Sequence, residues 1–303
     1  MPRILTIAAA QLGPITRSET RPQVVERLIG LLQQAKQHGC ELAVFPECAL
    51  TPFFPHWWIE DQAEIDSYCE SSLPGPETQP LFEEAARLGI GFCLGYAELV
   101  QEGEQTRRFN SAVVVEQDGR IVGHYRKVHL PGHADHRPSN PFQNLEKRFF
   151  EPGDLGFPVF EAFGAKTGML ICNDRRWPES YRCLSLQGCE LVLLGYNTPR
   201  HYPEYPETDR LADFHHQLSL QAGAYQNGMW IVAAAKAGVE EGVEQIGRSM
   251  IVAPSGEVVA RATTLGDELL IHRCDLDLCR TYKEGVFPAR NRRVESYGRL
   301  TQT

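Results

Sequence analysis

The chain has 303 residues, of which 42% are hydrophobic and 23% charged, a composition typical of a folded globular protein. Its formal net charge of −9 argues against nucleic-acid and anionic-membrane partners, because both attract a basic surface. No apolar run approaches the ~18 residues of a membrane-spanning helix, and the N-terminal apolar stretch is too short for a signal peptide. We therefore expect a cytoplasmic protein without nucleic-acid or membrane partners.

Strands and helices are predicted to alternate along the chain, which indicates an α/β fold. The segment 21–38 illustrates the signal, since its apolar residues recur on one helical face and Gly39 follows as a stop. Asp118-Gly119 predicts a hairpin turn. No linker or composition break interrupts the pattern, so one domain over residues 1–303 is expected. Strands are predicted over 4–11, 41–45, 90–99, 109–116, 120–127, 166–171, 190–196, 230–236, 248–253, 257–262 and 268–275, and helices over 21–38, 80–88, 177–187 and 207–226.

A short internal repeat links two of these strands. Gly-Cys-Glu-Leu occurs at 39–42 and again at 188–191, each time between a predicted helix and an apolar strand. The first strand leads to Glu47 and the second to Asn197. Because sites in α/β sheets form at the carboxyl ends of strands, two similar units would deliver a carboxylate and an amide to one edge. Coincidence in four residues is the alternative.

Nine cysteines are present, none in a CxxC pair, and their odd number favours free thiols over a disulfide framework. Most are expected to be small buried hydrophobic residues. Cys172 differs from the others, because it ends the apolar strand before Asn173-Asp174-Arg175-Arg176 and a predicted helix. Cations and a helix start both favour the thiolate, and backbone N–H groups at such a turn can receive an oxyanion.

A thiolate that attacks an amide needs a base and a group that stabilises the oxyanion. Glu47 follows an apolar strand, so partial burial would raise its pKa toward that of a useful base. Lys127 also ends a predicted strand and supplies a cation. Taken alone, each of these two residues is more often an ordinary exposed side chain. Their occurrence together at strand ends is what favours a catalytic group.

The stretches Phe45-Pro46-Glu47, Tyr125–Leu130 and Ile171-Cys172-Asn173-Asp174 resemble those of the nitrilase superfamily of carbon–nitrogen hydrolases, and the likeness covers nearly the whole chain. This resemblance implies a four-layer αββα sandwich and a Glu47–Lys127–Cys172 triad. It also implies an oligomer, a homodimer or homotetramer, in which the tail from about residue 280 to 303 packs in contacts between copies. No cofactor or metal is implied.

Within the superfamily, the chain is most similar to N-carbamoyl-D-amino acid amidohydrolases, through Thr51–Pro55, His129–His133, Leu145–Arg148, Asn173–Glu179 and Gly195–Pro199. In these enzymes the substrate presents a ureido carbonyl and a carboxylate. The Arg175-Arg176 pair offers forked donors for that carboxylate, and Asn197 and Thr198 add neutral hydrogen bonds. A structural salt bridge from the arginines to Asp174 or Glu179 is the alternative.

The chain departs from that pattern at Asn144, where the resembled enzymes carry a histidine. An amide can hydrogen-bond a ureido group but cannot shuttle a proton, so turnover or substrate preference is expected to differ. Glu146 is predicted to be a second active-site carboxylate that orients Lys127 or the substrate nitrogen. A surface ion pair with Lys147 or Arg148 is its alternative.

Other candidates are open to two interpretations. His129 is predicted to support substrate binding, and His215 and His216 to support the site, although each is equally consistent with a structural histidine. His133 and His136 have no further ligand at metal spacing, so no metal site is expected. Trp57-Trp58 is consistent either with a pocket wall or with core packing.

The sequence thus predicts hydrolysis of N-carbamoyl-D-amino acids to the D-amino acid, ammonia and carbon dioxide through a covalent Cys172 intermediate. In this mechanism Glu47 is the base, and Lys127 and the Asn173 N–H stabilise the oxyanion. One rival is another amidase of the superfamily, acting on β-ureido acids, carbamoyl polyamines or simple amides. The second rival is a catalytically silent binding protein on the same scaffold, which intact Glu47, Lys127 and Cys172 argue against.

Overall fold

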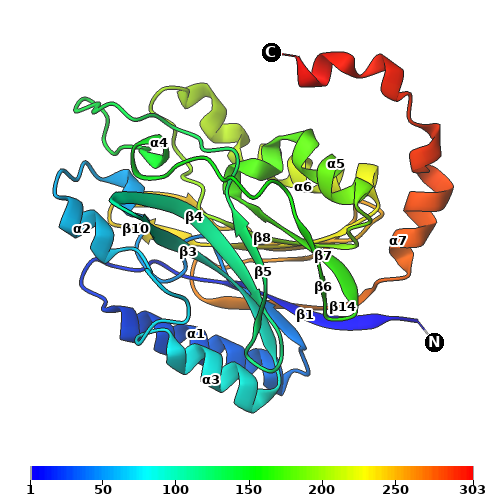
Figure 1. The fold of residues 1–303 in the computed structure, drawn as a ribbon, viewed down its shortest axis with the longest axis horizontal. Helices are drawn as coiled ribbons and strands as arrows, with labels where there is room; N and C mark the ends of the chain where they lie inside the picture. The colour runs from blue at the N-terminus through cyan, green and yellow to red at the C-terminus, as the bar shows by residue number, and fades with distance from the viewer. Residues whose placement is uncertain (1, 303) are drawn as a thin grey trace.

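The computed structural model describes residues 2–302 and contains two six-stranded sheets that stack face to face between two layers of helices (Figure 1). The expected four-layer αββα sandwich is therefore the observed fold. The first sheet has the order β14 (Glu268–Asp275), β1 (Ile4–Gln11), β2 (Leu42–Val44), β3 (Gly91–Glu102), β4 (Gln105–Val115) and β5 (Ile121–Arg126). The second has the order β13 (Val258–Arg261), β12 (Met250–Val252), β9 (Trp230–Ala235), β8 (Leu191–Tyr196), β7 (Ala165–Ile171) and β6 (Val159–Ala162).

Two pairs of helices form the outer layers. In Figure 1, α1 (Arg21–Gln37) and α3 (Gln79–Leu88) lie against the first sheet, and α5 (Pro178–Leu186) and α6 (Ala212–Asn227) lie against the second. The buried face of α1 consists of the apolar residues that the periodicity predicted, together with Val25. Smaller elements are α2 (Gln62–Ser67), α4 (Glu146–Phe149), α7 (Leu278–Arg280) and the separate hairpin β10 (Ala237–Glu240) and β11 (Val243–Ile246).

The short internal repeat marks two similar halves. In the first sheet, β2 lies between β1 and β3 and pairs with both in parallel. In the second sheet, β8 pairs in the same way with β7 and β9. Helices α1 and α5 precede β2 and β8, so Gly39 and Gly188 occupy equivalent turns, with φ of 78° and 88°. The two units were expected to share one sheet edge. They belong instead to two stacked sheets, whose ends meet.

Three other expectations differ from the structure. The predicted helix 207–226 begins as a 3-10 turn over Pro206–Leu211, and α6 starts only at Ala212. Strands β3 and β4 extend as far as a turn at Gly103, beyond the predicted 99 and 109, because their polar ends project past the core. The β10–β11 hairpin was not predicted, because Glu240, Glu241 and Gly242 give this segment a polar, loop-like sequence.

After α7 the chain leaves the four layers and follows a mostly exposed path of short helical turns (Figure 1). Lys283 anchors its beginning by donating to the carbonyl of Cys189. Packing of this tail between copies of the chain stays a prediction. Among residues 2–302, no helix combines the length and the apolar character needed to cross a membrane.

Candidate active site

Cys172 occupies a sharp elbow between the end of β7 and a 3-10 turn over Cys172–Arg176. Its φ of 47° lies in the left-handed region, which is uncommon for a residue with a side chain and frequent at functional sites. Asp174 holds this elbow, because its carboxylate accepts the Ile171 N–H at 3.1 Å and the Tyr125 hydroxyl at 2.7 Å. The nucleophile candidate is therefore presented at the strand end by a rigid, hydrogen-bonded turn.

Glu47 follows β2 and is completely buried. Its Oε1 accepts hydrogen bonds from Asn110 Nδ2 and Lys127 Nζ, both at 2.7 Å. Its Oε2 accepts the backbone N–H of Asn197, also at 2.7 Å. Burial of a carboxylate is costly unless donors surround it, and these three donors fix its position.

Lys127 and Glu146 complete a buried group of charges. Lys127 Nζ donates to Glu47 Oε1 and lies 2.5 Å from Glu146 Oε2. Burial alone lowers the pKa of Lys127, but Cys172, Glu146 and Glu47 raise it well above its usual value, so the ammonium persists. Burial raises the pKa of Glu146 to about 7 despite Lys127, which lowers it, and Glu47 adds to the rise. Glu146 can therefore exchange a proton near neutral pH.

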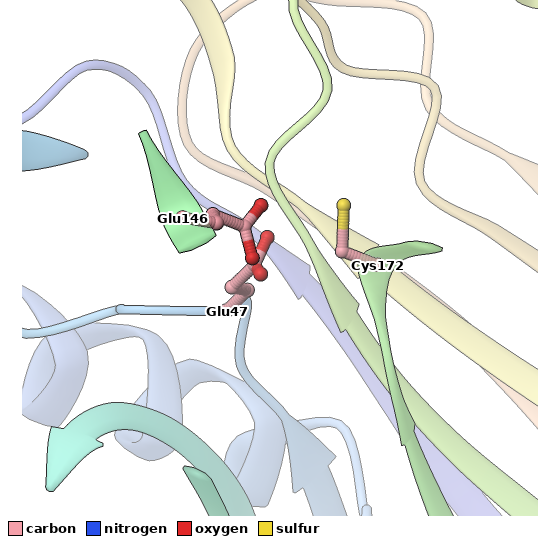
Figure 2. A group of neighbouring side chains, drawn as sticks. All are labelled: Glu47, Glu146 and Cys172. Carbon is pink, nitrogen blue, oxygen red and sulfur yellow. The ribbon is translucent and has the colours of Figure 1, made fainter. Parts of the chain in front are cut away.

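Figure 2 shows the carboxyl groups of Glu47 and Glu146 side by side, with the Cys172 sulfur beside them. An oxygen of each carboxylate and the sulfur lie within 4.8 Å of one another. In the described chain, these three residues are the one group near enough to share a metal ion. Lys127 already forms an ion pair with each of the two carboxylates, so proton transfer is the chemistry that this arrangement favours.

Nearby cations favour the Cys172 thiolate, as expected, but other effects outweigh them. Burial raises the pKa of the Cys172 thiol, and Glu47 raises it further, which outweighs the lowering by Lys127 and Arg175. The sulfur donates to the carbonyl of Asn197 at 3.1 Å. The helix start contributes little, because α5 begins only at Pro178. Cys172 thus rests as a thiol and needs a base to become a nucleophile.

The two adjacent arginines have different surroundings. Arg175 is buried and donates to the Cys172 carbonyl at 2.6 Å, to Thr198 Oγ1 at 2.9 Å and to His216 Nδ1 at 3.1 Å. Arg175 therefore stabilises the elbow through the Cys172 backbone. Arg176 is exposed and donates to the hydroxyl of Tyr202 at 3.3 Å. Neither arginine makes the alternative salt bridge to Asp174 or Glu179 within residues 2–302.

A cavity of about 360 Å³ opens over Cys172. It brings together several of the predicted residues, since Glu146, Asn173, Arg176 and Asn197 line it, as do Asn144 and His215. Arg175, Thr198 and His129 do not line it. The other residues of the cavity wall were not predicted as site residues from the sequence. They are Phe53, Pro131, Gly132, His133, Arg137, Pro199, Tyr202, Glu204, Tyr205, Thr208 and Ala212.

His129 has a structural environment. Its Nδ1 and backbone N–H lie 2.9 and 3.0 Å from Asp174 Oδ1, and its ring stacks on Trp177. It therefore helps to hold Asp174, and through it the elbow. Trp57 and Trp58 also lie outside the cavity wall, where they pack against the guanidinium groups of Arg17 and Arg148.

Asn110 is a site residue that was not predicted from the sequence. It donates to Glu47 and lies 3.5 Å from Glu146 Oε2, so it separates and orients the two carboxylates. Its position on β4, opposite Ala97 of β3, is set by strand pairing. The available signal was the polar pair Asn110-Ser111 between Phe109 and the apolar run that follows.

The chain is similar to known carbon–nitrogen hydrolases. The sequence model of the family described as carbon-nitrogen hydrolase matches residues 6–284. An N-carbamoylputrescine amidase of Arabidopsis thaliana is 33% identical over 309 residues, covering 97% of this chain and 94% of the relative. A protein of Pyrococcus abyssi named nitrilase is 31% identical, covering 98% and 100% of the two chains. A citrullinase of Francisella tularensis is also 31% identical, covering 98% of each.

Solved structures share the fold. A carbon-nitrogen hydrolase of Helicobacter pylori superposes with a TM-score of 0.84 at 23% identity, covering 98% of both chains. An amidase of Nesterenkonia sp. AN1, solved with a covalent adduct at its active-site cysteine, gives 0.74 at 21% identity, covering 98% of this chain and 96% of that one. The chain therefore belongs to the carbon-nitrogen hydrolase family of the nitrilase superfamily, and is an enzyme of this cysteine-dependent class.

Proposed function

We propose that the enzyme hydrolyses N-carbamoyl-D-amino acids to the free D-amino acid, ammonia and carbon dioxide. The environment of Arg176 is the observation that supports a substrate with a carboxylate group. Its guanidinium borders the cavity, and no carboxylate of residues 2–302 lies within ion-pair distance of it. The other arginine of the wall, Arg137, already pairs with Glu204 at 3.0 Å. A substrate carboxylate would provide the missing partner for Arg176.

The ureido group has its own partner in Asn197. The side-chain nitrogen of Asn197 donates to the Glu47 carbonyl, which fixes the orientation of the amide. Its Oδ1 is buried, has no hydrogen-bond partner among the described residues and belongs to the cavity wall. A buried acceptor of this kind favours a ligand that donates N–H groups. A carbamoyl amino acid offers such donors next to its carbonyl.

In the proposed reaction, Glu47 takes the proton of Cys172 Sγ and the sulfur adds to the carbamoyl carbon. Lys127 Nζ and the backbone N–H of Asn173 stabilise the oxyanion. The tetrahedral species collapses, the bond to the terminal nitrogen breaks, and Glu146 supplies the proton with which ammonia leaves. The proton that Glu47 took from Cys172 then replaces it on Glu146, so Glu47 is again a carboxylate. Water attacks the S-carbamoyl enzyme while Glu47 takes a proton from it, the C–S bond breaks as Glu47 returns this proton to the Cys172 sulfur, and the released carbamate loses carbon dioxide.

Carbamoyl polyamines are the main rival, because relatives named N-carbamoylputrescine amidase align over 97% of the chain. A polyamine would need a free carboxylate in the cavity. Glu204 is present there, but it accepts from both Arg137 at 3.0 Å and Asn140 at 2.7 Å. This pairing favours the acidic substrate. Preference for the D form rests on the likeness of Asn173–Glu179 and Gly195–Pro199 to the D-specific enzymes.

The test is an ammonia-release assay with an N-carbamoyl-D-amino acid, its L form, a β-ureido acid and N-carbamoylputrescine. Cys172→Ala should abolish release from all of them. Arg176→Met should raise KM for the acidic substrates by about tenfold to a hundredfold, the value of one charged hydrogen bond, and leave carbamoylputrescine unaffected. Arg120→Met, at an exposed hairpin turn, is the matched control. Faster turnover of any of the other three substrates than of the D form would contradict the proposal.

A further inference from the structure

A second buried lysine–glutamate pair lies behind the wall of the cavity. Lys236 follows β9 and Glu240 ends β10, and both side chains are almost completely inaccessible. Lys236 Nζ lies 3.0 and 3.3 Å from the two carboxylate oxygens of Glu240. Neither residue belongs to the Glu47–Lys127–Glu146 group or lines the cavity. A buried pair of this kind is weak evidence for stability, because desolvation offsets most of the attraction.

Both members of the pair also form hydrogen bonds with backbone groups of irregular segments. Glu240 Oε1 accepts the N–H of Phe53 at 2.6 Å, and Oε2 accepts the N–H of Ile15 at 2.9 Å. The third donor of Lys236 bonds the carbonyl of Thr51 at 2.5 Å. These backbone groups lie outside the ladders of the sheets, so they need side-chain partners when buried. The pair thus ties the segment that carries Phe53, which lines the cavity.

The same hairpin holds a second part of the cavity wall. Ile246 of β11 donates its N–H to the carbonyl of Thr198 at 2.9 Å, and the N–H of Arg200 donates to the carbonyl of Glu244 at 2.8 Å. Pro199, between these two bonds, also lines the cavity. One hairpin therefore connects the Phe53 wall with the Pro199 wall.

We propose that Glu240, held by Lys236, is a positioning residue that sets the place of the Phe53 wall relative to the Pro199 wall. It thereby determines which groups fit beyond the reacting carbonyl. The inference rests on Cys172 being the nucleophile at this cavity but not on the identity of the substrate. Glu240 acts through Phe53 and does not touch the reacting atoms.

The test compares alkylation of Cys172 by iodoacetamide, a small reagent, and by N-benzyl iodoacetamide, a bulky one. Because no substrate is involved, the result is independent of the proposed carbamoyl specificity. In Glu240→Gln, an amide NH₂ group replaces one of the two carboxylate oxygens. The hydrogen bond from either the Phe53 or the Ile15 N–H is therefore lost. We expect the rate constant for the bulky reagent to change about tenfold, and that for the small reagent less than about twofold.

Lys236→Met/Glu240→Gln removes the unpaired cation that Glu240→Gln leaves buried, and so separates positioning from stability. We expect its thermal midpoint to return toward that of the unmodified protein, while the altered ratio of the two rate constants persists. Glu241→Gln is the matched control, because the neighbouring exposed Glu241 also accepts a backbone N–H, from Arg17 at 2.8 Å, away from the cavity. An unchanged ratio in Glu240→Gln, or a ratio restored together with stability in the double variant, would overturn the proposal.

Discussion

The backbone N–H of Asn197 donates to Oε2 of Glu47 at 2.7 Å, and the Asn197 side chain donates to the Glu47 carbonyl at 3.0 Å. Glu47 follows β2 of the first sheet and Asn197 follows β8 of the second. These two bonds therefore join the sheets at the carboxylate that we assign as the base. The position of Glu47 depends on how closely the two strand ends approach.

Gly195 permits this approach. A methyl group at Gly195 would lie 2.5 Å from the N atom of Glu47 and 2.7 Å from the carbonyl carbon of Pro46. Both are backbone atoms, so the segment itself would have to move. Gly195→Ala should cost about 1–3 kcal/mol of unfolding free energy by overpacking. Displacement of Glu47 should also lower kcat/KM by up to about a hundredfold.

Urea unfolding and ammonia release measure these two effects. Gly30→Ala is the control, because nothing lies within 4 Å of the added methyl group on α1. It should stabilise the helix by about 0.5–1 kcal/mol and leave turnover unchanged. If Gly195→Ala behaved like Gly30→Ala, close contact between the strand ends would not position Glu47.

Removal of the base is the second prediction. Because burial and Glu47 keep Cys172 as a thiol, Glu47→Gln should lower kcat/KM by about 10²- to 10⁴-fold, the usual contribution of a general base. Lys127 keeps Glu146 as its partner, so the variant should fold. Glu257→Gln, at an exposed turn, is the control. Circular dichroism checks folding, and turnover within tenfold of the unmodified enzyme would exclude Glu47 as the base.

The sequence was sufficient to predict the positions that depend on strand ends. Cys172 and Glu47 each follow an apolar run, and such runs form the buried strands of an α/β sheet whatever the details of packing. Lys127 follows a strand that the hairpin turn at Asp118-Gly119 predicted. The structure brings all three together with Glu146. Most strands and the four main helices could be predicted for the same reason, since their periodicity is local.

Features that depend on tertiary contacts were not predictable. Arg175 and Arg176 are neighbours in the sequence, yet one is buried against Thr198 and His216 while the other reaches the cavity. The two side chains point in different directions because they are consecutive in a 3-10 turn, and no local sequence pattern predicts which of them is buried. Phe53 and Glu240 likewise become related only because the β10–β11 hairpin folds back on the segment after β2.

The pH dependence of turnover should identify Glu146. Since burial raises the pKa of Glu146 to about 7, this carboxyl loses its proton as the pH rises through neutrality. If protonated Glu146 assists the departure of ammonia, kcat should fall on the alkaline side of about pH 7. Glu146→Gln cannot lose a proton there, so its lower kcat should no longer show this step. An unchanged pH profile in the variant would assign the ionisation to another group.

Acid stability should reveal the buried His56. Burial, together with the nearby charge of Lys236, lowers the pKa of His56 to about 3 from an ordinary value of 6.5. Between these pH values the unfolded chain binds a proton that the folded chain does not. The unfolding free energy should therefore fall by about 1.4 kcal/mol for each unit by which the pH drops below 6.5.

His56→Leu should remove this contribution. Its unfolding free energy, measured by urea denaturation between pH 6.5 and 4.5, should decline less steeply than that of the unmodified protein. The difference between the two slopes is the readout, because burial also lowers the pKa of His216 and adds its own slope to both proteins. His38→Leu, at the exposed end of α1, is the control for the loss of a histidine side chain. Parallel curves for His56→Leu and the unmodified protein would mean that His56 accepts a proton without unfolding.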